Sequence, residues 1–234
     1  MGLFHTRTGY GRLQSYVFDR ALRRLVAPFH GFARGRLLPR VRPGMRVLDV
    51  GCGGGHFAIE LARHEPTLEV LGVDLSTRLL AWARDRAVEV ADRVTFVEAS
   101  ALDLPFGSGE FDLVYSLGSI KHWDDPARGL REAVRVLRPG GHLCVIEGDR
   151  GGRAEDVDAL VSLWRAPGPL RGLAAAFYRN AVVPGALDLA DAEALVRTIS
   201  GLDAVVARAP GLPILAIEGT RERAQEETPE GASA

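Results

Sequence analysis

The chain has 234 residues, of which 47% are hydrophobic and 25% are charged, and its formal net charge is −1 at pH 7. This composition supplies enough apolar residues to bury a core, which excludes disorder along the whole length. The near-neutral charge argues against nucleic acid as a partner, because proteins that bind nucleic acid normally carry a strong basic excess.

Cysteine usage and hydropathy narrow the class of protein further. Cys52 and Cys144 are too few for a disulfide framework or a cysteine metal cluster, and no other metal-ligand spacing is present, so we expect no metal site. No stretch approaches the roughly 18 apolar residues of a membrane span, and no signal peptide is recognisable. We expect a cytoplasmic protein whose oligomeric state the sequence leaves open.

The first 44 residues are strongly basic. They hold nine arginines against one acid, Asp19, and apolar residues such as Leu13, Val17 and Phe29 belong to an expected helix. We predict a basic helical lid or cap over residues 1–44. A surface that contacts anionic lipid is one alternative, and a solvated face that reflects the chain's general preference for arginine over lysine is another.

From residue 46 onward, short runs rich in β-branched residues alternate with segments of helical period. This alternation is typical of βαβ units around a parallel sheet. The predicted strands cover residues 46–50, 69–74, 93–98, 111–116 and 142–148, and a closing antiparallel pair covers about 202–209 and 212–219.

Helices are predicted between these strands. The first follows the glycines at 51–55, the second follows Ser76 as its N-cap and reaches Val90, and the third begins at Asp125 and Pro126 and should stop at RPGG, residues 138–141. Another helix is predicted over residues 188–200.

Residues 150–187 form an unusually long connection after the fifth strand. We expect helical pieces in this insertion rather than a bare loop, because structureless loops of this length are uncommon in compact domains. Its aromatic residues, Trp164, Phe177 and Tyr178, should pack within the insertion, and some could close over an apolar substrate. The polar tail over residues 221–234 is expected to be flexible.

A glycine-rich loop, residues 51–55, follows the first predicted strand. Ligands of open α/β sheets bind beyond the carboxyl ends of the strands, and the loop after the first strand borders that crevice. We expect Gly51, Gly53 and Gly55 to let backbone N–H groups face a ligand. Asp74, at the end of the second strand, is placed to accept hydrogen bonds from a ribose diol.

Asp49 separates two classes of cofactor. A carboxylate just before the glycines would repel a pyrophosphate, but it suits a ligand that carries positive charge, such as the sulfonium and ammonium of S-adenosylmethionine (SAM). We therefore prefer SAM, and the chain lacks the GxxxxGK[ST] pattern of a P-loop. An NAD-dependent oxidoreductase and a noncatalytic SAM-binding protein are the alternatives.

Four motifs in order, VLDVGCGGG, GVDLS, LPFGSGEFDLVYS and VLRPGGHL, resemble those of class I SAM-dependent methyltransferases, and in particular the small-molecule group that includes the ubiquinone and menaquinone biosynthesis methyltransferases. The resemblance spans about residues 45–148. It implies a Rossmann-like α/β fold, with a seven-stranded, mostly parallel sheet that ends in an antiparallel hairpin. The methyltransferase domain would then cover residues 45–220, with the insertion at about 150–187.

The resemblance also implies which residues contact the cofactor. Its methionine portion would lie along the glycine loop, its ribose beside Asp74, and its adenine against Leu75. In related proteins an acid followed by alanine comes after the third strand, whereas this chain has Ser100 and Ala101, so either Ser100 or Asp103 would accept from the adenine amine. The complete set is Asp49, Gly51, Cys52, Gly53, Asp74, Leu75, Ser100, Ala101, Leu102, Ser116 and Leu117.

Three residues are candidates for a catalytic base. His122 follows the fourth strand, where acceptor and methyl group should meet, and an ordinary imidazole can remove a proton near neutral pH. Glu147 and Asp149, at the end of the fifth strand, are rivals. A base is not obligatory, because holding donor and acceptor in line can itself lower the barrier by several kcal/mol.

The function that the resemblance implies is transfer of a methyl group to an oxygen, nitrogen or carbon nucleophile of a small metabolite, quinone-like or lipid-like. The fourth strand ends in YSLGS, not in the NPPY-like motif of enzymes that methylate bases or amides, which again argues against a nucleic-acid substrate. The long insertion is the segment we expect to select the substrate.

Overall fold

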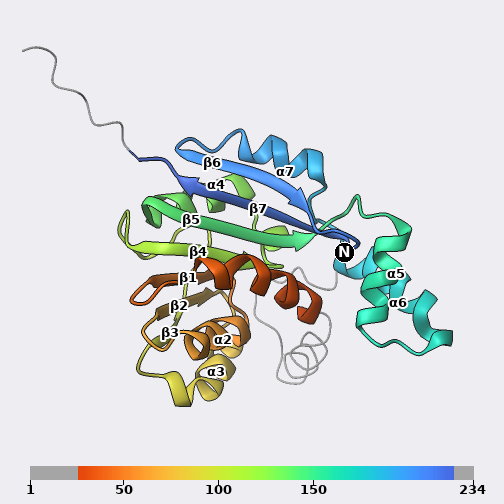
Figure 1. Ribbon diagram of the computed structural model, residues 1–234, viewed down its shortest axis with the longest axis horizontal. Helices are drawn as coiled ribbons and strands as arrows, with labels where there is room; N and C mark the ends of the chain where they lie inside the picture. Colours follow the sequence, from red (N-terminus) through yellow and green to blue (C-terminus); the bar gives the residue numbers. More distant parts are fainter. Residues whose placement is uncertain (1–25, 224–234) are drawn as a thin grey trace, which may run out of the picture.

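A computed structural model describes residues 26–223 of the chain (Figure 1). The expected lid over residues 1–44 lies largely outside these residues. Of the lid, the structure describes a helix over 26–37 and the 3-10 turn η1 (Leu38–Arg40). Among the described residues, no helix is both long and apolar enough to cross a membrane.

Seven strands form one sheet in the order β3-β2-β1-β4-β5-β7-β6. β7 alone runs opposite to the other strands, so the sheet is mostly parallel and closes with an antiparallel pair, which confirms the predicted fold class. The strands are β1 (Arg46–Val50), β2 (Glu69–Asp74), β3 (Val94–Glu98), β4 (Phe111–Leu117), β5 (Leu137–Gly148), β6 (Leu202–Arg208) and β7 (Ile214–Arg221).

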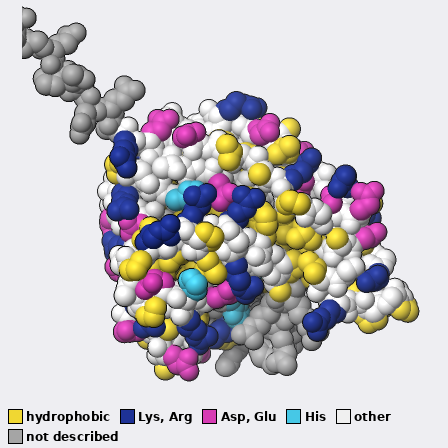
Figure 2. Space-filling view, viewed as in Figure 1, with side chains coloured by type: hydrophobic (Ala, Val, Ile, Leu, Met, Phe, Trp, Pro, Cys, Tyr) yellow, Lys and Arg dark blue, Asp and Glu magenta, His cyan; other side chains and the backbone are white. Residues whose placement is uncertain are grey.

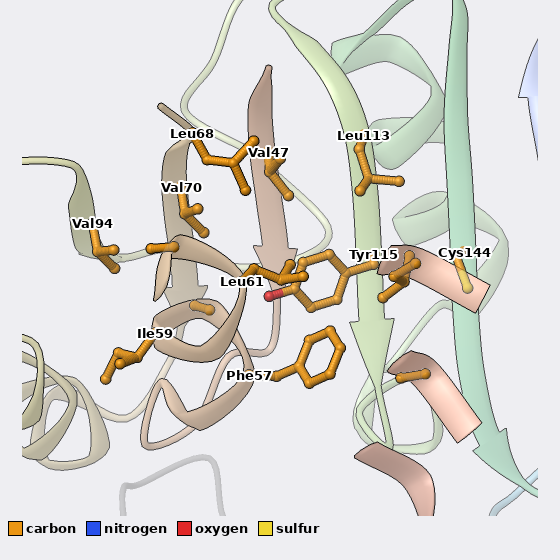
Figure 3. Packing of buried hydrophobic residues seen from close by; sticks show 14 of the residues in the cluster. Val47, Phe57, Ile59, Leu61, Leu68, Val70, Val94, Leu113, Tyr115 and Cys144 are labelled. Atoms are coloured by element: carbon orange, nitrogen blue, oxygen red, sulfur yellow. The ribbon is translucent and has the colours of Figure 1, made fainter. Parts of the chain in front are cut away.

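Helices cover both faces of the sheet because successive residues of each strand point to opposite sides. Val47 belongs to the core under helix 26–37, α2 (His56–His64) and α3 (Thr77–Arg86). Leu48 belongs to the core under α4 (Pro126–Val136) and α7 (Leu189–Val196). Figure 3 shows the first core, where Phe57 of α2 packs edge-on against Tyr115 of β4 with ring centroids 5.5 Å apart.

The insertion after β5 folds into short helices with a small core of its own. It comprises α5 (Ala154–Leu163), η4 (Gly168–Leu170), α6 (Arg171–Phe177) and the π-turn η5 (Tyr178–Val182). Leu160 and Tyr178 are buried in its core, and Trp164 packs edge-on to Tyr178 at 5.9 Å. Phe177 was expected to pack in this core, but its side chain is 40% exposed. In Figure 1 the insertion projects beyond the carboxyl end of β5.

Several predicted boundaries were wrong by one or more residues, and the larger differences are the following. The helix after Ser76 ends at Arg86, and Val90 is buried by the separate 3-10 turn η2 (Val88–Val90). The fifth strand begins at Leu137, which pairs with Phe111 of β4, and not at residue 142; the pairing is irregular between Leu137 and His142, over RPGG. The preceding helix does stop before RPGG as predicted, at Val136. The helix predicted over 188–200 ends at Val196.

The C-terminal tail also begins later than predicted. Arg221 is the last residue of β7, not the first of a flexible tail, because its backbone pairs with Leu202 and its guanidinium donates to the carbonyl oxygens of Arg135, at 2.8 Å, and of Leu137. The rest of the predicted tail, from residue 224 onward, lies outside the described part of the chain.

Candidate active site

The loops that follow β1, β2 and β4 converge at one edge of the sheet. The chain builds outward from β1 to β2 and β3 on one side, and through β4 and β5 on the other. β1 and β4 are therefore the neighbours at which the strand order reverses, and the crevice beyond their carboxyl ends is where open α/β sheets bind ligands. Asp49 and the glycine loop lie at this point.

The backbone of the glycine loop is held by β2. The amides of Gly51 and Cys52 both donate to the Val73 carbonyl, at 2.8 and 2.9 Å, and the Gly53 amide donates to an Asp74 carboxylate oxygen at 2.9 Å. Our expectation that these N–H groups face a ligand was therefore wrong. A loop in which the amides of Gly51, Cys52 and Gly53 are already used is poorly suited to a pyrophosphate, which needs such donors free.

The glycines themselves serve different purposes. Gly51 and Gly53 have φ angles of +77° and +51°, where side chains are strained. A Cβ on Gly51 would fall 2.0 Å from the Ser119 hydroxyl oxygen, so this glycine lets the loop after β4 approach. A Cβ on Gly53 would meet nothing within 4 Å, so this side of the loop is open to a ligand. Gly55 is needed for packing on Phe96 of β3, not for ligand approach.

Asp74 joins the loops after β1 and β2. One carboxylate oxygen accepts from Gly53, and the other accepts from the Ser76 amide at 2.8 Å. Burial raises the pKa of Asp74, and these backbone donors partly offset the effect. Each carboxylate oxygen keeps a further lone pair with which it can accept from a ribose hydroxyl. Leu75, the next residue, is 69% exposed and offers an apolar surface beside it.

Asp49 is almost completely buried, with 3% of its surface exposed. Burial raises its pKa to about 8, the Tyr115 hydroxyl opposes that rise, and the charge of Asp74 adds to it. Tyr115 stands opposite Asp49 on β4, and its hydroxyl has no well-aligned hydrogen-bond partner among residues 26–223. A nearby cation would favour the ionised Asp49, so these groups fit a positively charged ligand.

The loop after β3 holds the two candidates for an adenine contact. The Ser100 hydroxyl oxygen accepts from the Leu102 amide at 3.1 Å, and the Asp103 amide donates to the Ser100 carbonyl at the same distance. Ser100, Ala101 and Leu102 are partly buried, whereas Asp103 is exposed. The serine hydroxyl is thus partly committed to its own loop.

The end of β4 carries Ser116 and Leu117. Ser116 is 1% exposed, and its hydroxyl has no hydrogen-bond partner among the described side chains and backbone. Leu117 is half-buried and packs, like Cys52, against the core under α2. The Cys52 sulfur turns inward toward Gly72, and burial raises the pKa of its thiol, which argues against a nucleophile.

The three candidate bases differ in their surroundings. Glu147 accepts from the Lys121 ammonium at 2.7 Å and from the Gly148 amide at 2.8 Å. Asp149 accepts from Arg208 at 2.7 Å and from the Gly151 amide at 2.8 Å. Both carboxylates are buried in ion pairs, whereas His122 is exposed at the end of η3 (Ile120–His122). The carboxylates would have to give up a cation to act as bases.

Sequence reasoning missed four residues that organise this region. Ser119 accepts from the Trp123 indole at 3.0 Å and covers Gly51, while Tyr115 lies beside Asp49. Lys121 and Arg208 pair with Glu147 and Asp149. Lys121 could have been noticed as the single lysine of the chain.

Several known proteins are similar to this chain. A family model described as a methyltransferase domain matches residues 48–145. The chain is 39% identical over 139 residues to the 27-O-demethylrifamycin SV methyltransferase of Amycolatopsis mediterranei, a match that covers 58% of this chain and 48% of that protein. It is 40% identical over 102 residues to the demethylmenaquinone methyltransferase of Deinococcus radiodurans, covering 44% of this chain and 42% of that protein.

The fold is shared with a solved structure, a SAM-dependent methyltransferase from Aquifex aeolicus, with a TM-score of 0.64 at 16% identity over 91% of this chain and 99% of that one. The chain spans about half of the curated relatives named above. The resemblance seen in the sequence is confirmed: residues 48–145 carry a class I SAM-dependent methyltransferase domain, whose cofactor is SAM.

Proposed function

We propose that this chain, which carries a class I SAM-dependent methyltransferase domain at residues 48–145, transfers the methyl group of SAM to an oxygen, nitrogen or carbon nucleophile of a small quinone-like or lipid-like molecule. The observation that carries the proposal is the pairing of a glycine loop whose amides are used internally with a buried Asp49. This combination favours a cationic ligand and disfavours the pyrophosphate of NAD.

The residues that would hold the cofactor follow from this geometry. Asp49 and the open side of Gly53 would receive the charged methionine portion, and Asp74 would accept from the ribose hydroxyls. Leu75, exposed beside Asp74, would pack on adenine. When bound, SAM supplies a methyl group activated by its sulfonium, so the protein need not generate a strong electrophile.

The chain's own contribution is to position the acceptor and exclude water. The hydroxyl of Tyr178 donates to the Pro213 carbonyl at 2.7 Å and lies within 3.2 Å of where a Cβ on Gly148 would be. The insertion is thereby fixed over the end of β5, on the side where the acceptor would enter. Among the three candidate bases we favour His122, because Glu147 and Asp149 already neutralise Lys121 and Arg208.

The substrate class rests on the similar proteins and on the insertion. By their names, the two relatives described above act on a demethylated rifamycin and on demethylmenaquinone. Both are small molecules, and we extend only this class to the present chain. The insertion packs Trp164 and Tyr178 in a core of its own, and would stand as a separate unit beside the proposed entrance.

The test is a methyl-transfer assay with SAM labelled in its methyl group and a panel of quinols, phenols, amines and fatty acids. We expect label to enter at least one acceptor. His122→Gln should lower kcat by about a hundredfold or more and flatten the pH profile, with SAM affinity unchanged. His64→Gln, an exposed histidine at the end of α2, is the matched control. SAM binding without transfer to any acceptor would contradict the proposed catalysis.

A further inference from the structure

The insertion carries an unusual share of the exposed apolar surface. Seven large hydrophobic side chains are exposed among residues 26–223, and four of them belong to this one segment, whereas Leu75, Val88 and Val205 are scattered. The four, which we call the apolar tip, are Leu163 (57% exposed), Leu170 (52%), Leu173 (69%) and Phe177 (40%).

The apolar tip faces away from the insertion's own core. Leu170, Leu173 and Phe177 are spaced by three and four residues through η4 and α6, so they share one side of the helix. Ala175 and Tyr178 lie on the other side and pack with Leu160 of α5. The packing of the insertion therefore does not require apolar residues at the tip.

Basic residues surround the apolar tip, and acids are absent from it. No Asp or Glu occurs between Asp158 and Asp188, whereas Arg165, Arg171 and Arg179 are all exposed. Arg171 donates to the Ser162 hydroxyl at 3.1 Å, and no ion pair to a carboxylate is formed by these arginines within residues 26–223. Figure 2 shows apolar and basic side chains together at the outer end of this lobe.

We propose that the apolar tip and its three arginines dock the protein on an anionic lipid bilayer. Leucine and phenylalanine side chains would enter the boundary between headgroups and acyl chains, while the guanidinium groups would contact anionic headgroups. Four side chains are too few for the roughly 800 Å² that each partner buries in a stable protein interface. Interfacial membrane binding, in contrast, needs only some apolar area and matching charge.

The position of the apolar tip suggests what docking on a bilayer would do, and this step rests on the proposed function. The insertion lies at the carboxyl end of β5, anchored by the bond from Tyr178 to Pro213. Docking through the tip would turn the acceptor side of the sheet toward the bilayer. A lipid-like acceptor could then pass from the bilayer to the site without crossing water.

The experiment is cosedimentation of the full chain with vesicles of phosphatidylcholine alone, or mixed in equal amounts with phosphatidylglycerol. We expect binding to the mixed vesicles only. The double variant L170S/L173S should lower the partition coefficient about tenfold or more, since each leucine loses most of its transfer free energy. The matched control is V88S/V205S, which removes two apolar side chains elsewhere that are also more than half exposed, and it should leave binding unchanged.

The charge contribution is measured in the same assay. R171Q/R179Q should lower binding to the mixed vesicles about fivefold for each arginine removed, whereas R128Q/R197Q, which replaces two exposed arginines outside the insertion, should change it far less. Equal binding of wild type and L170S/L173S would overturn the proposal. So would self-association without vesicles that L170S/L173S abolishes, because the tip would then join two copies of the chain.

Calorimetry with SAM on the same proteins separates this inference from the proposed function. L170S/L173S should bind SAM as wild type does, which shows that the variant is folded. If the wild type binds vesicles through the apolar tip but does not bind SAM, the proposed function is contradicted and the inference of a docking surface is retained.

Discussion

Replacing Asp49 with asparagine tests whether a buried carboxylate selects the cationic ligand. Burial raises the pKa of Asp49 to about 8. A carboxyl group with that pKa is ionised to about 1% at pH 6 and to about 9% at pH 7. If the ligand binds the ionised form, binding releases a proton, and SAM affinity should rise by up to about tenfold per pH unit between about pH 5 and pH 7.

The assay is calorimetric titration with SAM across this range, where the ammonium of the ligand stays protonated. Repeating it in buffers of different ionisation enthalpy counts the released proton directly. D49N should bind SAM more weakly at pH 7 by up to about tenfold, because it loses a charge-assisted contact whose gain in the wild type is reduced at this pH by the cost of ionising Asp49. The affinity of D49N should not vary with pH through this group. A flat profile in wild type, or the same slope in D49N, would contradict a role for ionised Asp49 in binding SAM.

The same carboxyl group affects stability, with a definite sign. Its pKa in the folded protein lies above the ordinary value of 3.8, so the folded state holds the extra proton between about pH 4 and pH 8. The contribution of Asp49 is therefore most favourable below about pH 4 and falls as the pH rises through about 8. D49N should remove this decline in thermal unfolding experiments, and bound SAM should reduce it.

Three further predictions concern single contacts. Gly53→Ala and Gly44→Ala both place a side chain at positive φ with open space around it, so each should lower the free energy of unfolding by about 1–2 kcal/mol. Of the two, only Gly53→Ala should weaken SAM binding in calorimetry. Arg208→Ala leaves the buried Asp149 carboxylate with the Gly151 amide as its remaining donor, and should lower the free energy of unfolding in urea by about 1–3 kcal/mol. Arg197→Ala, an exposed control, should lower it by less than about 0.5 kcal/mol. Equal effects of the two substitutions would contradict a stabilising role for the ion pair. Asp103→Asn should weaken SAM binding more than Ser100→Ala, because the serine oxygen already accepts from Leu102, and the reverse order would assign the adenine contact to Ser100.

The parallel strands could be predicted because short, continuous apolar runs between turn or helix signals are typical of buried strands. β1 and β2 begin and end at the predicted residues, since each is a run of residues buried on both faces between clear turn or helix signals. The start of β5 was missed because RPGG carries strong turn chemistry. Its pairing with Phe111 on β4 is a tertiary contact that local sequence does not reveal.

The residues of the candidate site could also be predicted only in part. Asp49 and Asp74 could be placed at the cofactor crevice because each ends a strand that the pattern defines. The partners of Glu147 and Asp149 could not, since Lys121 and Arg208 are 26 and 59 residues away in the chain and meet them only through the sheet topology. The bonding of the loop amides to Val73 likewise depends on the register of β1 against β2.

The most direct test of the account is a pair of titrations of the full chain, freed of copurified nucleosides, with SAM and with NAD. Asp49 and the internally bonded glycine loop predict saturable binding of SAM at one site and no binding of NAD at the same concentration. Saturable binding of NAD by a folded protein that gives no response to SAM would contradict it.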